Sequence, residues 1–138
     1  MKNTLYKTNQ HACYLLNYHL VIVAKYRHPV FENEEVDKRL KEIASFIFDE
    51  KWKCPIQSIE TDRDHVHILF GGNPQTELSK LINNFKTVSS RRLRKEFPEY
   101  LERFYWKPYF WSRSYFIGTV SEVTESIVKQ YIENQGQK

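Results

Sequence analysis

The sequence predicts one α+β domain in which helices pack on an antiparallel sheet, and three observations support this prediction. The chain has 138 residues, a length typical of one domain. Apolar residues make up 41% and charged residues 28%, which is ordinary for a globular protein. Strand-like and helix-like hydrophobic patterns follow one another in the order β-α-β-β-α-β-α. A four-stranded antiparallel sheet backed by helices, in a ferredoxin-like or RRM-like arrangement, is the simplest packing of this order.

The first half of the chain is predicted to contain a strand, a helix and a pair of short strands. Residues 14–25 are rich in β-branched and aromatic residues, which is typical of a strand. Apolar residues then recur at helical spacing over 34–52, and Asn33 is suited to cap this helix. Two short strands are predicted over 56–60 and 65–70.

The second half is predicted to contain a long helix, a strand and a final helix. The long helix covers about 77–95, with one apolar stripe and one basic face. The strand covers 111–119, and Thr119 or Ser121 can start the last helix. We therefore interpret 1–138 as a single domain, with a polar arm over 1–13 and a C-terminal helix over 120–138.

Basic residues are concentrated between Lys80 and Arg113. This segment contains nine basic and only three acidic residues, and aromatic residues are interspersed among them. Basic side chains neutralise phosphates, and aromatic faces can stack on unpaired bases. This composition suits single-stranded nucleic acid. A solvated helix followed by an aromatic segment that packs in the core explains it equally well, so composition alone leaves both interpretations open.

Neither secretion nor membrane insertion is expected. The longest aliphatic run, residues 20–24, is far shorter than the ~20 apolar residues of a membrane-spanning helix. The N-terminus has no apolar stretch of signal-peptide length. The two cysteines, Cys13 and Cys54, are too few for a disulfide framework and are expected to be buried thiols. These features favour a cytoplasmic protein.

Two histidines, His65 and His67, are separated by one residue in a predicted strand. Side chains alternate across a sheet, so both imidazoles are expected on one face. Together they can bind one divalent ion, provided that a third donor comes from elsewhere. For an isolated His-x-His pattern, two partly exposed histidines without a ligand are the more common outcome.

The last helix adds two candidate residues, Tyr131 and Gln135, which are four positions apart and therefore lie on the same helical face. Gln135 offers an amide oxygen, and Tyr131 offers a phenol that can act as a nucleophile. An amphipathic aromatic residue and a solvated polar residue near a chain end are the plain alternatives.

Further polar residues, three of them close to the histidines in the sequence, are candidate site residues. The carboxylates are Glu60, Asp62 and Asp64, for which a solvated turn is favoured over contact with a metal ion. For His19, in the first strand, a sheet histidine with a satisfied hydrogen bond is favoured over contact with DNA or metal.

The segment 64–69, DHVHIL, and the segment 131–135, YIENQ, together resemble the single-tyrosine HUH transposases, the IS200-like family of small bacterial and archaeal insertion sequences that move as single strands. HUH denotes two histidines around a bulky hydrophobic residue. The same resemblance extends to further segments, namely YHL at 18–20, KYRH at 25–28, SSRR at 89–92 and TVSE at 119–122. It spans about residues 14–136, nearly the whole chain.

This resemblance implies a set of roles. His65, His67 and Gln135 correspond to the ligands of Mg²⁺ or Mn²⁺, and Tyr131 corresponds to the nucleophile. The family forms homodimers that bind DNA hairpins at transposon ends, and it cuts and rejoins single-stranded DNA through a 5′-phosphotyrosine intermediate. Its active site is commonly composite, with the tyrosine helix of one subunit serving the histidines of the other. A prokaryotic cytoplasmic enzyme, on the nucleoid when bound to DNA, is implied.

Five basic residues, in or just after the first strand, in the long helix and in the last strand, are candidates for contact with DNA. They are Lys25, Arg27, Arg91, Arg92 and Arg113.

Three other functions remain as alternatives. One alternative is a non-catalytic single-stranded nucleic-acid-binding module of RRM-like fold, although the RNP1 pattern is absent. Another is a related HUH nuclease, such as a repeat-associated transposase, a replication initiator or a relaxase. A third is a metal-binding structural or regulatory protein, in which Tyr131 would be dispensable.

Overall fold

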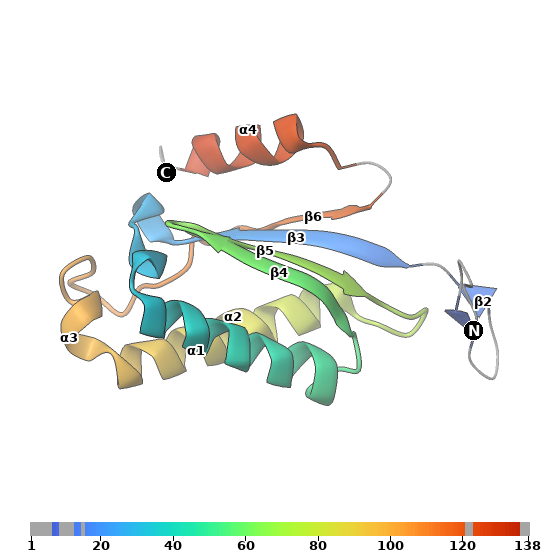
Figure 1. Cartoon of the computed structure of the whole chain (residues 1–138), viewed down its shortest axis with the longest axis horizontal. Helices are drawn as coiled ribbons and strands as arrows, with labels where there is room; N and C mark the ends of the chain where they lie inside the picture. The colour runs from blue at the N-terminus through green and yellow to red at the C-terminus, as the bar shows by residue number, and fades with distance from the viewer. Residues whose placement is uncertain (1–6, 9–12, 15, 121–122, 136–138) are drawn as a thin grey trace.

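The structure, a computed structural model, describes residues 7–8, 13–14, 16–120 and 123–135. A four-stranded antiparallel sheet lies between two layers of helices (Figure 1). Its strands run in the order β4-β5-β3-β6, as in ferredoxin-like domains. Their bounds are β3 (Asn17–Val23), β4 (Ile56–Asp62), β5 (His65–Gly71) and β6 (Phe116–Thr119). The predicted α+β fold is confirmed.

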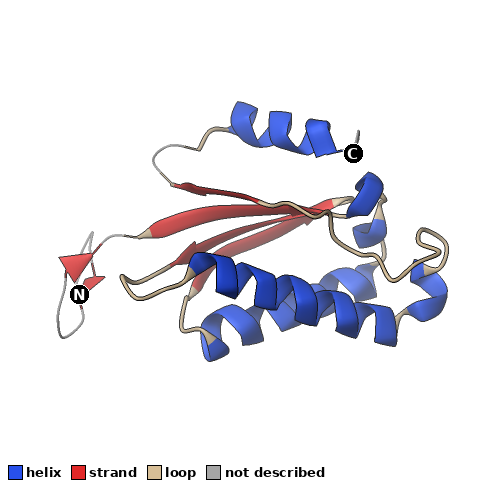
Figure 2. Cartoon of the chain, turned by 180° about the vertical axis from the view of Figure 1, so that it is seen from behind, coloured by secondary structure: helices blue, strands red, loops and turns tan. Residues whose placement is uncertain are grey.

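Helices cover both faces of the sheet, as Figure 2 shows from behind. One face is covered by α1 (Glu34–Ala44), α2 (Leu78–Glu96) and the short α3 (Pro98–Leu101), and the other by α4 (Glu125–Gln135). No helix in the described ranges is long and apolar enough to cross a lipid bilayer. The side chain of Asn33 caps α1 as predicted, since it accepts hydrogen bonds from the backbone N–H groups of Glu35 and Val36.

The predicted strand over 14–25 and helix over 34–52 are each divided in the structure. Residues Cys13–Tyr14 (β2) pair with Lys7–Thr8 (β1) in a separate two-stranded sheet. At the other end of β3 the chain enters a 3₁₀ turn at Lys25–Arg27. The helix changes to π-helical hydrogen bonding over Ser45–Lys51. The rest of the predicted arm lies outside the described residues.

The last strand and the last helix are shorter than predicted. Trp111 forms only an isolated bridge to Ala24, and beyond it the Lys86 ammonium donates to the carbonyls of Ser112 and Arg113, at 2.8 and 2.9 Å. Thr119 still belongs to β6, so it cannot start the helix. Ser121 lies outside the described residues.

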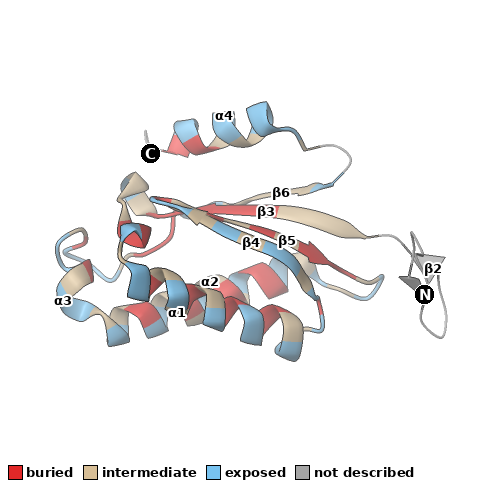
Figure 3. Ribbon diagram, in the orientation of Figure 1, coloured by how far each residue is buried: buried red, intermediate tan, exposed pale blue. Residues whose placement is uncertain are grey.

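The main core lies between the sheet and the helices α1 and α2 (Figure 3). Phe48, Phe70 and Phe85 are fully buried, with ring centroids 5.0 Å (Phe48–Phe70) and 5.4 Å (Phe48–Phe85) apart. Cys54 is buried here as predicted, whereas the side chain of Cys13 lies outside what the structure describes.

A second, smaller apolar cluster joins α4 to the opposite face of the sheet. It consists of Val21 and Val23 of β3 and Ile132 of α4, with Val128 packed against them. Alternation along β3 thus sends Leu20 and Ile22 to the main core and the two valines to α4.

Replacing Tyr105 with phenylalanine is expected to destabilise the fold by about 1–2 kcal/mol at neutral pH. The buried Tyr105 hydroxyl shares its hydrogen between the carbonyls of Lys25 (2.9 Å) and Phe110 (3.3 Å). It thereby stabilises the 3₁₀ turn that begins at Lys25. Burial raises the pKa of this phenol. Its contribution is therefore complete below the pKa of the unfolded chain, about 10, and is lost as the pH rises above it.

Urea unfolding of the wild type and of Tyr105→Phe between pH 7 and 11 measures this difference. The gap between the two free energies of unfolding should narrow above pH ~10. Tyr26→Phe, which removes a hydroxyl from an exposed side chain, is the matched control and should change stability by less than ~0.5 kcal/mol. A gap that widens with pH would contradict the assignment.

Candidate active site

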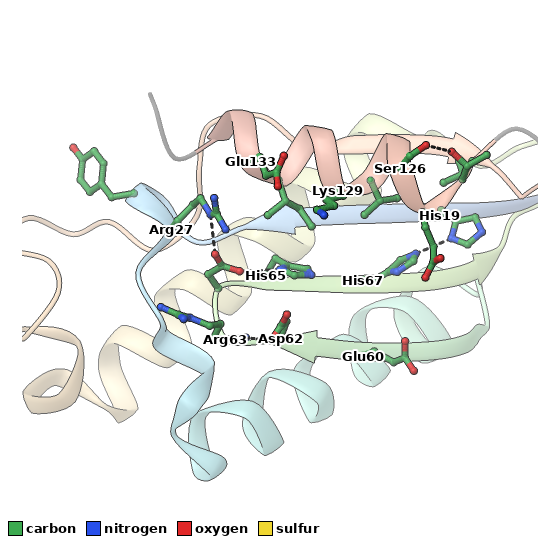
Figure 4. Close-up of a pocket in the computed structure, with 17 residues that line it drawn as sticks. His19, Arg27, Glu60, Asp62, Arg63, His65, His67, Ser126, Lys129 and Glu133 are labelled. Carbon is green, nitrogen blue, oxygen red and sulfur yellow. Dashed lines mark hydrogen bonds and ion pairs between the residues drawn. The ribbon is translucent and has the colours of Figure 1, made fainter.

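A cleft of about 1110 Å³ lies between α4 and the sheet face opposite the main core. Its lining comes from β3, β4, β5, the β4–β5 turn and the inner side of α4, and includes His65 and His67 (Figure 4). The small apolar cluster between α4 and β3 is continuous with this cleft through Val128 and Ile132. The cleft is therefore the space between the helix and the strands β3, β4 and β5.

His65 and His67 both face this cleft from β5. The register pairs His65 with Val23 and Asp62, and His67 with Val21 and Glu60. Val66, between them, is fully buried in the main core. The prediction that both imidazoles share one face is confirmed.

His65 is held by a buried carboxylate. Asp64 Oδ1 lies 2.8 Å from His65 Nδ1, and Asp64 Oδ2 accepts a hydrogen bond from Arg27 Nε at 2.9 Å. Burial opposes the ionisation of Asp64, but the hydrogen bonds from His65 and Arg27 outweigh it and lower its pKa. Asp64 is thus an anion with two partners.

The prediction of a solvated turn is wrong for Asp64, which is only 4% exposed. The segment after β3 covers it, because Ala24 N–H donates to the Asp64 carbonyl and Phe31 N–H donates to the Arg63 carbonyl. Glu60 and Asp62 are exposed, as expected.

His67 has a different neighbour. Its Nε2 lies 2.7 Å from Nδ1 of His19, and the two ring centroids are 4.9 Å apart. Burial lowers the pKa of His67, and the nearby His19 lowers it further. His19 is therefore a sheet histidine with a hydrogen-bond partner, as favoured from the sequence, and that partner is one of the two cleft histidines. No local sequence pattern indicates this contact, since it depends on the β3–β5 register.

Tyr131 and Gln135 lie on one face of α4, but this face is turned away from the histidines. Tyr131 Oη lies 2.9 Å from Ser114 Oγ, which also donates to Gln135 Oε1 at 3.2 Å, and the Tyr131 ring packs on Phe116. Burial raises the pKa of Tyr131, and the hydrogen bond with Ser114 partly offsets this. Neither residue lines the cleft.

A single chain thus brings together only two of the three predicted metal ligands. Among the described residues, no cluster of three or more His, Cys, Asp or Glu side chains has the arrangement of a metal site. The chemistry of His65, His67 and Gln135 still fits a divalent ion, because two imidazole nitrogens and an amide oxygen are suitable donors. For such a set, Gln135 must come from a differently placed α4.

The candidate DNA-binding cations are distributed over both sides of the sheet. Arg27 lines the cleft, whereas Lys25 does not, and the Lys25 ammonium lies 4.8 Å from the ring centre of Tyr109. Arg91 and Arg92 are exposed on α2, which covers the sheet face opposite α4 (Figure 1). Arg113 is exposed in the loop before β6.

Two cations of the cleft were not identified from the sequence. They are Arg63, in the β4–β5 turn, and Lys129, on the inner side of α4. Lys129 could not be recognised because its position depends on how α4 docks, which no local pattern specifies.

The model of one protein family, described as "Transposase IS200 like", matches residues 12–135. The chain belongs to this family. The ISDra2 transposase TnpA of Deinococcus radiodurans is 36% identical over 125 residues, 91% of this chain and 87% of that protein. The transposase for insertion sequence element IS200 of Salmonella typhimurium is 30% identical over 133 residues, 94% of this chain and 82% of that protein.

A solved structure agrees with this assignment. A transposase from Deinococcus radiodurans R1, crystallised and solved at 1.90 Å resolution, superimposes with a TM-score of 0.84 at 36% identity and covers 94% of this chain and 97% of its own. As an IS200-like transposase, the chain is an enzyme of DNA cleavage and strand transfer. This argues against the non-catalytic RRM-like module and against the structural or regulatory metal protein.

Proposed function

We propose that this IS200-like transposase cleaves and rejoins single-stranded DNA at hairpin-bearing transposon ends, with Tyr131 as the nucleophile. His65, His67 and Gln135 would hold Mg²⁺ or Mn²⁺. The observation that carries the proposal is the pair of imidazoles on one face of β5, inside a cleft of about 1110 Å³, in a chain of this family.

With the two histidines and Gln135 as its only protein ligands, a bound divalent ion would have room to accept phosphate oxygens as well. When bound, a divalent ion supplies Lewis-acid polarisation of the scissile phosphate and offsets the negative charge that develops on it. Mixed nitrogen and oxygen donors suit Mn²⁺ as well as Mg²⁺. Arg27, Arg63 and Lys129 add positive charge around the same cleft and favour an anionic strand there.

Tyr131 supplies the covalent step. Its Oη bonds to the scissile phosphorus as the P–O3′ bond breaks, the phenolic proton passes to solvent, and the leaving 3′ oxygen takes up a proton. The products are a 5′-phosphotyrosine and a free 3′-OH. A second 3′-OH can reverse the step on another strand, so strand transfer needs no ATP.

The enzyme is proposed to act as a homodimer with a composite site. Tyr131 and Gln135 contact Ser114 of their own chain and do not line the cleft that contains their own histidines. Supply of the tyrosine helix to the partner's histidines would bring the three ligands and the nucleophile together. A twofold dimer then has two such sites from one gene.

The experiment that tests this function uses a 3′-labelled single-stranded hairpin oligonucleotide with Mg²⁺, with Mn²⁺ and with EDTA. We expect a denaturation-resistant protein–DNA adduct with the hairpin in the presence of Mg²⁺ and in the presence of Mn²⁺. No adduct is expected in EDTA, and none with a fully paired duplex. Undiminished cleavage in EDTA would contradict the metal site. Binding of the hairpin without any adduct would instead favour a binding module.

Helix α2 is proposed to bind the hairpin, and the cleft to bind the single strand. Arg91 and Arg92 are exposed, and neither forms an ion pair within the described part of the chain. Replacing both with alanine should lower the slope of log affinity against log salt for the hairpin by up to ~2 units, because each phosphate contact contributes about one unit.

The matched control is the double substitution Lys38→Ala and Lys51→Ala, which removes the same charge from exposed positions on the neighbouring helical segments. It should leave the slope within ~0.5 units of the wild type. The slopes are measured by fluorescence anisotropy from 50 to 300 mM salt. Equal slopes for the two double variants would contradict the binding of the hairpin to α2.

A further inference from the structure

A chain of two hydrogen bonds stands behind one of the cleft histidines. It runs from Arg27 Nε to Asp64 Oδ2 (2.9 Å) and from Asp64 Oδ1 to His65 Nδ1 (2.8 Å). The Asp64 side chain is 6% exposed, and Arg27 and His65 are 37% and 16% exposed. The carboxylate is thus enclosed between a cation and the imidazole.

The position of Asp64 is fixed from its backbone as well. Its carbonyl accepts from Ala24 N–H at 2.8 Å, and the preceding carbonyl, of Arg63, accepts from Phe31 N–H at 3.0 Å. The same segment carries Arg27, which has a φ of 57° and follows Tyr26 with a φ of 60°. Residues other than glycine rarely adopt this left-handed backbone region. The turn that directs Arg27 toward Asp64 therefore has an uncommon backbone conformation.

We infer that Asp64, held by Arg27, is a positioning residue that fixes His65 as the Nδ1–H tautomer, with its unprotonated Nε2 left free for the metal ion. The inference deepens the proposed function, because it rests on the metal role of His65. A carboxylate accepts hydrogen bonds only, so it selects the tautomer that donates from Nδ1. Metal ligation requires the other nitrogen to be unprotonated, and partners of this kind orient the ring and raise its basicity.

The neighbouring histidine gives a contrast within the same site. Nε2 of His67 is engaged by His19, another imidazole, which can either donate or accept. His19 therefore imposes no tautomer on His67. Within the pair, only His65 has a partner that can serve solely as an acceptor.

Substitution of Asp64 by asparagine separates orientation from packing, because the side chain keeps its shape. An asparagine has one accepting oxygen and one donating nitrogen. If the oxygen faces Arg27, the amide nitrogen faces His65 and favours the Nε2–H tautomer, which cannot bind a metal ion through Nε2. Asp62→Asn is the matched control: Asp62 also lines the cleft and pairs with His65 in the sheet register, and the substitution removes the same charge.

The tautomer is read from long-range ¹H–¹⁵N correlation spectra of the metal-free protein near pH 8, where an ordinary imidazole is neutral. The His65 signals are identified by their absence in His65→Gln. We expect Nδ1–H in the wild type and in Asp62→Asn, and a shift toward Nε2–H in Asp64→Asn. Mn²⁺ affinity, measured by electron paramagnetic resonance of the free ion, should fall ~10–100-fold in Asp64→Asn and less than ~3-fold in Asp62→Asn.

An Nε2–H tautomer of His65 in the wild type would overturn the inference, and this measurement needs no variant to fold. Equal losses of Mn²⁺ affinity in the two variants would also overturn it, since charge alone would then explain the effect. The expected tautomers combined with no Mn²⁺ binding by the wild type would support the orientation of His65 and contradict the metal ion of the proposed function.

Discussion

Replacing Tyr131 with phenylalanine is expected to abolish strand cleavage, with a loss of more than about 10³-fold in rate. Only the phenolic oxygen is removed, and the ring contact with Phe116 can remain. Hairpin affinity should therefore stay within about twofold of the wild type. Denaturing gels with a 3′-labelled hairpin oligonucleotide measure cleavage, and anisotropy measures binding.

The matched control is Tyr115→Phe, which removes the phenolic oxygen of the residue that follows Ser114 in the sequence, Ser114 being the residue that Tyr131 contacts. It should cleave at the wild-type rate within about twofold. If Tyr131→Phe still formed a denaturation-resistant adduct at a comparable rate, the nucleophile would have to be another residue.

Mixing Tyr131→Phe with His67→Ala is expected to restore cleavage that neither variant shows alone. If the tyrosine acts in trans, a heterodimer has one site with both substitutions and one site with neither. Random exchange makes half of the dimers heterodimers, so the mixture should reach about a quarter of the wild-type activity. The physical reason is the orientation of α4, whose Tyr131 faces Ser114 rather than its own His67.

If the tyrosine acted in cis, each site of the heterodimer would carry one substitution, and the mixture would stay inactive. Subunit exchange is checked by mixing chains with two different affinity tags and recovering both on one resin. A mixture that exchanges subunits yet does not cleave would refute the trans arrangement, while leaving the tyrosine chemistry to be judged by the single variants.

Local patterns were sufficient to predict most of the fold. Alternation along 65–70 separated His65 and His67 from the buried Val66, and the capping side chain of Asn33 marked the start of a helix. These features depend on neighbours within a few residues, which the sequence displays directly.

Features set by contacts between distant segments could not be predicted. The burial of Asp64 depends on the segment after β3, and the start of β6 at Phe116 depends on its pairing with Val21 of β3. The contact of His19 with His67 depends on sheet register. The face that α4 presents to the sheet depends on the docking of Val128 and Ile132, so the pattern placed Tyr131 and Gln135 together without showing where they point.

The central claim, that Tyr131 becomes covalently joined to DNA, is tested most directly by locating the adduct in the chain. After reaction with the hairpin oligonucleotide, nuclease trimming and tryptic digestion, mass spectrometry should find a nucleotide 5′-phosphate on the peptide 130–138, QYIENQGQK, attached to Tyr131. A nucleotide attached to any other peptide, or cleaved DNA without an adduct on any peptide, would contradict the claim.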